Sequence, residues 1–320
     1  MDRRPSSADS ASPEAETPQY HSHPLANGAP PAWASGWGED HFGPFVEISI
    51  KPYDGGKLVV QRLRWIPPGE FTMGSPEDEP GRDDDEGPQH RVKLTQGYWL
   101  FDTPVTQALW LSVTAENPSE FQSSNRPVEN ISFDDVKKFL TVINERHPGL
   151  ELALPTEAQW EYACRAGVEH ATYAGPIDIK GINNAPVLND IAWYGGNSSD
   201  GFELDHGEDC SEWEEKAIEG EQAGSHPVAK KSANKWGLYD MLGNVWEWCA
   251  DDMRDYKNDD ITDPNDMEAS ARVVRGGSWG GYARRVRAAF RILREPGGRF
   301  NDLGFRCLRV QGGKKGGSLE

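Results

Sequence analysis

Residues 168–235 carry no apolar pattern with the period of a helix or a strand; glycine, asparagine, aspartate and serine dominate this stretch. A structureless segment of this length inside a domain is usually functional or stabilised locally by a metal ion. The chain also contains 34 glycines and 12 tryptophans. These numbers favour a loop-rich fold held together by aromatic side chains and argue against a helical bundle.

Regular elements are predicted on either side of this stretch. Alternating apolar residues indicate strands, and apolar residues at helical spacing after a Ser or Thr cap indicate helices. Ser132 is the predicted cap of one helix, and Thr156 with Gln159 matches a capping box at the start of another. We predict strands over 45–50, 58–67 and 90–100, and helices over 106–114, 132–145 and after Thr156.

The two ends of the chain differ from the rest in composition. Residues 1–42 are rich in Pro, Ser, Ala and Gly and are predicted to be a disordered tail, whereas 311–320 resemble a tag remnant. The ordered domain is predicted over 43–310. No apolar stretch follows the basic N-terminal residues, so no secretory signal is expected, and no run of about 18 apolar residues exists that could span a membrane. A cytoplasmic protein is expected.

The charge balance is strongly acidic. The chain has 33 Lys and Arg residues against 52 Asp and Glu residues, a formal net charge of −19. A protein this acidic is not expected to bind nucleic acid through its general surface. The most acidic run, 76–87, is predicted to be a solvated loop kept out of the core by its own repulsion, with a cation site as the alternative. Four cysteines are too few for a disulfide scaffold.

Seven motifs follow one another along the chain: FTMGS, PVTQALW, RPVENISFDDVKKFL, LPTEAQWEYACRAG, KWGLYDMLGNVWEW, VRGGSW and LGFRC. They occur in the order found in the formylglycine-generating-enzyme (sulfatase-modifying factor) family, which this chain resembles over about residues 65–310. Seven ordered motifs are more specific than one short pattern. The resemblance implies a single α+β domain with a C-type-lectin-like fold of the formylglycine-generating-enzyme type, low in regular secondary structure.

The resemblance bears on catalysis through two cysteines. Enzymes of this family oxidise a sulfatase cysteine to formylglycine, and two cysteines shortly after the GGS[WY] motif hold copper(I), for which thiolates are soft ligands. Here no cysteine lies between Cys249 and Cys307. Neither formylglycine generation nor copper binding is therefore expected. No HExxH motif, Ser/His/Asp signature or Walker loop suggests another enzyme class.

The resemblance also implies one structural calcium ion, wrapped by the GLYDMLGNVWEW segment. The ligands would be the side chains of Asp240 and Glu247 and the carbonyls of Gly243 and Val245. Calcium prefers carboxylate and carbonyl oxygens, and Gly243 permits the tight turn that such a site needs. In the alternative interpretation, Asp240 caps a turn and Glu247 pairs with an arginine.

Positive charge is concentrated near the C-terminus. Residues 272–309 hold ten arginines, no lysine and two acids. These arginines form either an anion-binding surface or ion pairs with the acidic body of the protein. Arg285 and Arg294 are expected to be exposed. Internal ion pairs are favoured for the arginines that belong to the family framework, which are Arg275, Arg287, Arg291 and Arg306.

The segment 272–307 resembles the variable region of one subgroup of this family, the variable proteins of diversity-generating retroelements. There, an asparagine-rich template is copied with mutation of its adenines, which cannot turn an Asn codon into Trp, Gln, Lys, Met or Glu. The resemblance marks twelve variable positions, and none holds any of those five residues. The variable positions are Gly280, Gly281, Tyr282, Arg285, Phe290, Ile292, Leu293, Arg294, Gly298, Phe300, Asn301 and Asp302.

The residue types at the variable positions favour a binding surface. Five of them are large and apolar within a region rich in Gly and Arg, and exposed aromatic and arginine side chains are typical contacts at protein interfaces. Burial in the core is the alternative for Phe290 and Leu293. The remaining positions of 272–307, here called frame positions, include Trp279, Leu303 and Phe305.

We therefore predict a non-enzymatic, cytoplasmic binding protein whose C-terminal variable surface recognises a protein or another macromolecule. No nucleic-acid partner is expected. Two alternatives stay open: an oxidoreductase of the same family with altered metal chemistry, and a pseudo-enzyme that serves as a structural or regulatory module.

Overall fold

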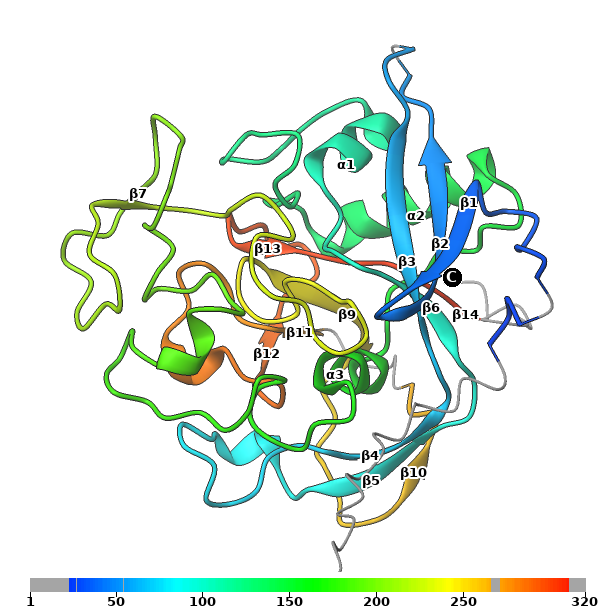
Figure 1. The fold of residues 1–320 in the computed structure, drawn as a ribbon. Coiled ribbons are helices and arrows are strands. Elements are labelled where there is room, and N and C mark those ends of the chain that lie inside the picture. The colour runs from blue at the N-terminus through cyan, green and yellow to red at the C-terminus, as the bar shows by residue number, and fades with distance from the viewer. Residues whose placement is uncertain (1–22, 27, 54, 266–270, 311–320) are drawn as a thin grey trace, which may run out of the picture.

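The computed structural model describes residues 23–26, 28–53, 55–265 and 271–310. Within these ranges the chain forms four β-sheets and three α-helices, an α+β architecture with long irregular connections (Figure 1). The helices are α1 (Gln107–Thr114), α2 (Phe133–Arg146) and α3 (Glu157–Arg165), and the 3-10 turns are η1 (Asp84–Glu86), η2 (Pro186–Leu188) and η3 (Ala283–Arg285).

The largest sheet joins the first strands of the described chain to its last one, and all its strands pair antiparallel. Val46, Ile48 and Ile50 are buried and alternate with half-buried residues, which is the period-two pattern of a strand with one face in the core. In spatial order the strands are β1 (Gly36–Asp40), β2 (Gly43–Ile50), β3 (Val59–Ile66), β6 (Tyr98–Phe101) and β14 (Leu308–Val310).

Ordered structure begins earlier than the sequence predicts. β1 pairs with β2 along its whole length, and Leu25 is buried in the core. The predicted tail boundary at residue 42 is therefore wrong, because even a glycine-containing segment supplies backbone donors and acceptors to a sheet edge. The rest of the predicted tail, 1–22, and the tag-like residues 311–320 lie outside the described residues.

The three helices begin at the caps that the sequence contains. Ser132 and Asp135 exchange side-chain to backbone hydrogen bonds at the start of α2. Thr156 and Gln159 do the same at α3, and Thr106 caps α1. These caps satisfy backbone N–H groups that have no partner inside the helix, so the predicted helices are confirmed. None of the helices in the described ranges is long and apolar enough to cross a bilayer.

Two smaller sheets flank α3 (Figure 1). The predicted strand 90–100 is in fact two strands. Residues 90–94 join the three-stranded sheet, and residues 98–101 join the five-stranded sheet. Gly97 lies between them against Trp65, where a Cβ would overlap the indole ring. The four-stranded sheet has the order β12 (Arg291–Arg294), β11 (Arg272–Arg275), β9 (Trp246–Asp252) and β13 (Leu303–Gly304). The three-stranded sheet has the order β10 (Ile261–Thr262), β5 (His90–Leu94) and β4 (Gly69–Met73).

The irregular stretch 168–235 has little regular structure, as predicted. It contains η2 and one short antiparallel pair, β7 (Glu208–Asp209) with β8 (Gln222–Ala223). Its turns are held by side chains that satisfy the backbone. Asn197, for example, accepts a hydrogen bond from the N–H of Tyr194 and donates one to the carbonyl of Ala192. Such local bonds let a long loop pack without a sheet or a helix.

Two large apolar clusters and one small cluster form the core. The first lies between the five-stranded sheet, α1 and α2 and includes Trp110 and Trp248. The second surrounds α3 and includes Trp160 and Tyr194. The small cluster contains Trp279, which packs edge-on against Phe121 at 5.2 Å between ring centroids. The tryptophans thus hold irregular segments to the sheets, as their number in the sequence indicates.

Candidate functional site

The segment 272–307 crosses the four-stranded sheet (Figure 1, orange to red). β11 is an inner strand paired with β9 and β12, and β13 pairs with β9. The variable positions fall in the β11–β12 connection, in β12 at the edge of the sheet, and in the β12–β13 connection. The frame therefore supplies the inner part of the sheet, while the variable positions lie at its edge and in its loops.

Ten of the twelve variable positions reach the surface. Tyr282, Leu293 and Phe300 are the most open, with exposed fractions of 45%, 43% and 41%. Single exposed apolar side chains are normal on protein surfaces, whereas several that lie together mark an interaction site. The half-buried variable positions are Gly280, Arg285, Ile292, Arg294, Gly298, Asn301 and Asp302.

Two of the twelve are buried, so their prediction as surface contacts is wrong. Phe290 is 2% exposed and lies against Trp246, with 5.9 Å between ring centroids. Gly281 is buried as well, because its backbone bonds to Ser278 on one side and to Gly195 on the other. Both residues therefore belong to the protein interior and do not contribute to the surface.

The exposed aromatic residues each lie beside an arginine. The Arg285 guanidinium lies 5.0 Å from the Tyr282 ring centroid, and the Arg294 guanidinium lies 5.0 Å from the Phe300 ring centroid. At this separation a cation is attracted to the face of the ring. All four residues are variable positions, so the variable segment presents two aromatic–arginine pairs.

Frame residues connect the two loops that carry these pairs. The Trp279 indole N–H donates to the carbonyl of Asn301 at 3.2 Å, and the Ser278 hydroxyl donates to the Asp302 carboxylate at 2.8 Å. Burial raises the pKa of Asp302. The β11–β12 connection and the β12–β13 connection therefore share hydrogen bonds and are held as one unit.

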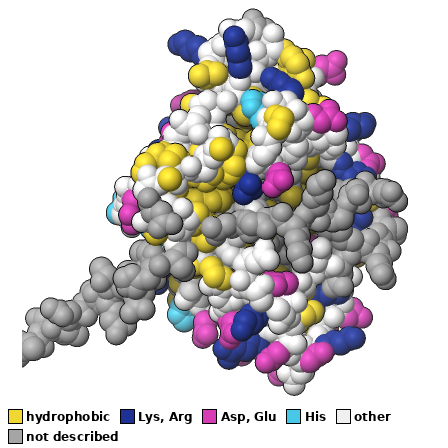
Figure 2. Space-filling view, turned by 90° about the vertical axis from the view of Figure 1, so that its right-hand side faces the viewer, with side chains coloured by type: hydrophobic (Ala, Val, Ile, Leu, Met, Phe, Trp, Pro, Cys, Tyr) yellow, Lys and Arg dark blue, Asp and Glu magenta, His cyan; other side chains and the backbone are white. Residues whose placement is uncertain are grey.

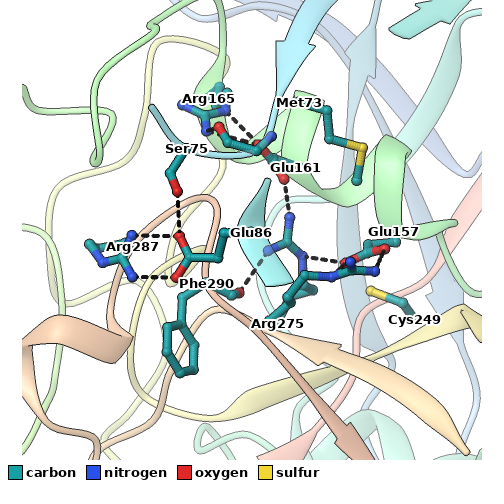
Figure 3. A network of polar contacts seen from close by, with 12 residues as sticks. Met73, Ser75, Glu86, Glu157, Glu161, Arg165, Cys249, Arg275, Arg287 and Phe290 are labelled. Atoms are coloured by element: carbon teal, nitrogen blue, oxygen red, sulfur yellow. Dashed lines mark hydrogen bonds and ion pairs between the residues drawn. The ribbon is translucent and has the colours of Figure 1, made fainter. Parts of the chain in front are cut away.

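The acidic run 76–87 takes part in holding this unit (Figure 3). Both Glu86 carboxylate oxygens accept from Arg287, at 2.5 and 2.8 Å, and Glu79 accepts from the same guanidinium at 2.5 Å. Ser75 donates to Glu86 at 2.8 Å. The prediction of a fully solvated loop is wrong for these two acids, because arginine charge compensates their burial.

Two further arginines of the frame pair with glutamates of α3 (Figure 3). Arg275 forms ion pairs with Glu157 and Glu161 and donates to the Phe290 carbonyl at 2.7 Å. Arg291 bonds both oxygens of Glu157, at 2.7 and 2.6 Å. Burial alone would raise the pKa of Glu161, but Arg165 and Arg275 hold it below its ordinary value. The predicted internal pairing of the framework arginines is thereby confirmed.

The four residues of the predicted calcium site lie close together in sequence, and the carboxylates of two of them already have partners. Both Glu247 oxygens accept from Arg306, each at 2.7 Å, and one also accepts the indole N–H of Trp160. Asp240 accepts from the N–H of Ala229 at 2.7 Å and from the Asn244 amide. Burial raises the pKa of Asp240 to about 6.

This donor set does not fit calcium. A calcium ion takes six to eight oxygen ligands, whereas both Glu247 carboxylate oxygens already accept hydrogen bonds from Arg306, and Asp240 accepts from Ala229 and Asn244. Among the described residues, no group of three or more His, Cys, Asp or Glu side chains is arranged to hold a metal. The turn itself does need Gly243, whose φ is +76° and whose Cβ would overlap the Trp193 carbonyl. Val245 is buried beside it.

Asp240→Ala is expected to lower the melting temperature by the same amount in calcium and in EDTA. The change removes a buried acceptor from two donors, which costs about 1–3 kcal/mol. Thermal unfolding of the wild type and the variant in both buffers checks this. A loss seen only in calcium would contradict the geometry and restore the calcium site implied by the resemblance.

All four cysteines are buried and free. Burial raises the pKa of Cys164 to about 12 and also raises those of Cys210, Cys249 and Cys307. Thiolates, not thiols, act as nucleophiles and metal ligands. In this arrangement none of the four is prepared for either role.

Two acidic residues near the variable positions carry no sequence signal for a site. Glu120 accepts a hydrogen bond from the Asn301 amide at 3.0 Å. Glu129 is fully buried, and one of its oxygens has no hydrogen-bond partner among the described residues. The pKa of Glu129 is raised to about 8, mainly by burial, with smaller contributions from the charges of Glu120 and Asp302. Their proximity arises only from tertiary packing.

A pocket of about 610 Å³ opens beside Arg299, between α1, α2 and the β2–β3 hairpin. Its floor includes Trp110 and Phe139, whose rings stack at 5.3 Å, and its rim includes Tyr53 and Lys138. The volume is within the range of ligand pockets. Except for Arg299, its lining lies outside 272–307, so the pocket is a fixed feature of the surface.

Further apolar side chains are exposed away from the variable positions. Figure 2 shows hydrophobic side chains at the surface of the face that is turned to the right in Figure 1. The exposed apolar residues contributed by β1, β3 and the β2–β3 hairpin are Trp37, Tyr53, Leu58 and Val60. None of these is a variable position.

Comparison with known proteins gives matches over most of the chain. The family described as a sulfatase-modifying factor enzyme 1-like domain matches residues 57–311. The formylglycine-generating enzyme of Mus musculus is 28% identical over 225 residues, 68% of this chain and 52% of the mouse protein. That of Thermomonospora curvata is 29% identical over 303 residues, 76% of this chain and 91% of that protein.

A solved structure gives a similar result. Treponema denticola variable protein 1 matches with a TM-score of 0.62 and 27% sequence identity, over 82% of this chain and 98% of that one. The resemblance predicted from the ordered motifs and from the segment 272–307 is confirmed.

Proposed function

We propose that this chain, which belongs to the sulfatase-modifying factor enzyme 1-like family and has its C-type-lectin-like fold, is a non-enzymatic binding protein. Its binding surface is formed by the exposed variable positions between 280 and 302, and its ligand is a protein or another macromolecule. Fold alone does not decide function, so the proposal depends on the arrangement of these residues.

One observation carries the proposal: most frame positions of 272–307 are buried, whereas most variable positions are exposed or half-buried. The frame arginines 275, 287 and 291 are fully buried and ion-paired. Ten of the twelve variable positions reach the surface between them. A scaffold built in this way separates stability from recognition, since surface side chains can change without loss of the core.

The absence of the enzymes' cysteine pair supports a role other than catalysis. No cysteine lies between Cys249 and Cys307, and these two thiols are themselves buried with raised pKa values. The structural likeness to a variable protein supports recognition of a macromolecule by this surface.

The test of diversification is the nucleotide sequence beside the gene. We expect a nearby non-coding copy of codons 272–307 that differs from the gene only where the copy has adenine, next to a reverse transcriptase. A copy whose differences fall at the ten variable positions that are exposed or half-buried would support the proposal. A locus without such a copy would overturn diversification and leave a family member of fixed sequence.

The non-enzymatic part has its own test. Purified protein is incubated in air with copper(I) and a sulfatase-type peptide that contains the substrate cysteine. We expect no aldehyde in the peptide by mass spectrometry and no oxygen uptake above the peptide-free control. Formation of formylglycine would overturn this part of the proposal.

A further inference from the structure

The ten arginines of 272–309 divide into two groups. Eight form ion pairs with carboxylates of the body, and their partners come from many parts of the chain, including the acidic run, α2, α3 and β9. The eight are Arg272, Arg275, Arg284, Arg287, Arg291, Arg299, Arg306 and Arg309.

The other two are Arg285 and Arg294. Among the described residues neither has a carboxylate within 4.0 Å, and the only hydrogen bond of the Arg294 side chain runs to the neighbouring Leu293 carbonyl, at a long 3.4 Å. The Arg285 Nε is buried without a hydrogen-bond partner. These two arginines are also the two arginines that occupy variable positions. The unpaired charge of the segment thus coincides with its variable part.

Each unpaired arginine is oriented by an aromatic ring. Arg285 lies over Tyr282 and Arg294 lies over Phe300. Each ring limits the movement of the guanidinium beside it, and four of the five guanidinium N–H donors belong to its two terminal nitrogens. Such a group is prepared to bind a carboxylate through two parallel hydrogen bonds, with little further loss of side-chain entropy.

We infer that the ligand is a protein whose contact surface presents aspartate or glutamate carboxylates to Arg285 and Arg294, with apolar groups against Tyr282, Leu293 and Phe300. This inference rests on the proposed binding function and adds the chemistry of the partner. The arginines supply charge complementarity, and the exposed aromatic residues supply the apolar contact area that interface centres require.

The charges around the two arginines favour discrete carboxylates over a nucleic-acid backbone. Glu295 is exposed and follows Arg294 in the sequence, and the Arg294 charge partly offsets the rise in the pKa of Asp302. Asp83 pairs with Arg284, the residue before Arg285. The chain as a whole carries a net charge of −19. A continuous polyanion would meet these acids on either side of the arginines, whereas single carboxylates would not.

The experiment follows the arginine Nε–Hε resonances by NMR while a tetraglutamate peptide with blocked ends is added. We expect saturable shifts of two resonances, which disappear in Arg285→Gln and Arg294→Gln respectively, while the resonances of the paired arginines stay in place. The double variant should bind the peptide about tenfold more weakly, and a high concentration of NaCl should weaken wild-type binding in the same direction. Unchanged melting temperatures would show that the variants fold.

The matched control is Arg299→Gln. Arg299 is exposed in the same segment but pairs with Asp135, so its loss should change peptide affinity less than about twofold. A tetraglutamine peptide with the same blocked ends, which has no charge, should shift neither resonance.

Two results would overturn the inference. One is the absence of any shift at Arg285 and Arg294 with the acidic peptide. The other is a shift of both by a short oligothymidylate at lower concentration than by the peptide, which would indicate phosphate recognition. Failure here is distinguishable from failure of the proposed function, because the search for the adenine-marked copy does not depend on arginine chemistry.

Discussion

Arg287→Met is expected to lower the free energy of unfolding by about 3–5 kcal/mol at pH 8, since removal of one partner leaves buried charge without compensation. The variant leaves Glu79 and Glu86 together in the interior without their cation. Methionine matches the length of the aliphatic part of arginine and keeps the packing of that part, so the loss reports mainly on the guanidinium and its charge. Urea unfolding of both proteins measures it.

The loss should depend on pH in a defined direction. Burial already raises the pKa of Glu79 even with Arg287 present. Without the cation, protonation of the acids relieves the unpaired charge, so the destabilisation should be smaller at pH 5 than at pH 8.

Arg299→Met is the matched control for this variant. Arg299 also pairs with an acid, Asp135, but both groups are partly exposed. Surface pairs of this kind contribute about 0–1 kcal/mol. Equal losses for the two variants, or a loss at position 287 that does not vary with pH, would contradict the role given to the buried network.

Phe290→Ala is expected to lower the free energy of unfolding by about 3–5 kcal/mol, whereas Phe300→Ala is expected to change it by less than about 1 kcal/mol. Both residues are phenylalanines at variable positions, but Phe290 is 2% exposed and Phe300 is 41% exposed. Removal of the buried ring leaves a cavity beside Trp246. Removal of the exposed ring leaves none.

Thermal and urea unfolding of the two variants check this pair. A large loss for Phe300→Ala would place its ring in the core and would remove it from the binding surface. A small loss for Phe290→Ala would return that position to the surface. If the expected difference is found, position 290 tolerates only large apolar residues, and diversification there is limited by packing.

Several parts of the fold were predictable because their causes are local in sequence. Ser132 and Thr156 start helices through hydrogen bonds to residues three positions later, and Val46 and Ile48 alternate with polar residues because successive side chains of a strand face opposite ways. The resemblance also identified which arginines are internal, since it separates frame from variable positions. Arg285 and Arg294, which the sequence predicts to be exposed, are half-buried, and neither has a carboxylate within 4.0 Å among the described residues.

Other features depend on residues that are far apart in the chain. The acidic run 76–87 looks solvated in the sequence because acids alone repel one another; it is partly buried because Arg287, far along the chain, reaches Glu86. Glu129 and Asp302 approach each other only because the β12–β13 connection packs against the segment before α2. No pattern within a short window contains either contact.

Motif order, capping residues and composition are enough to predict the family, the helices with their caps and the loop-rich character of 168–235. The exposure of the proposed variable positions, the ion pair between Glu247 and Arg306, and the lack of a carboxylate partner for two arginines among the described residues come only from packing between distant segments. The difference arises from the sequence distance over which each interaction acts. Propensity, capping and strand alternation act over a few residues, whereas burial and charge compensation depend on which distant segments meet.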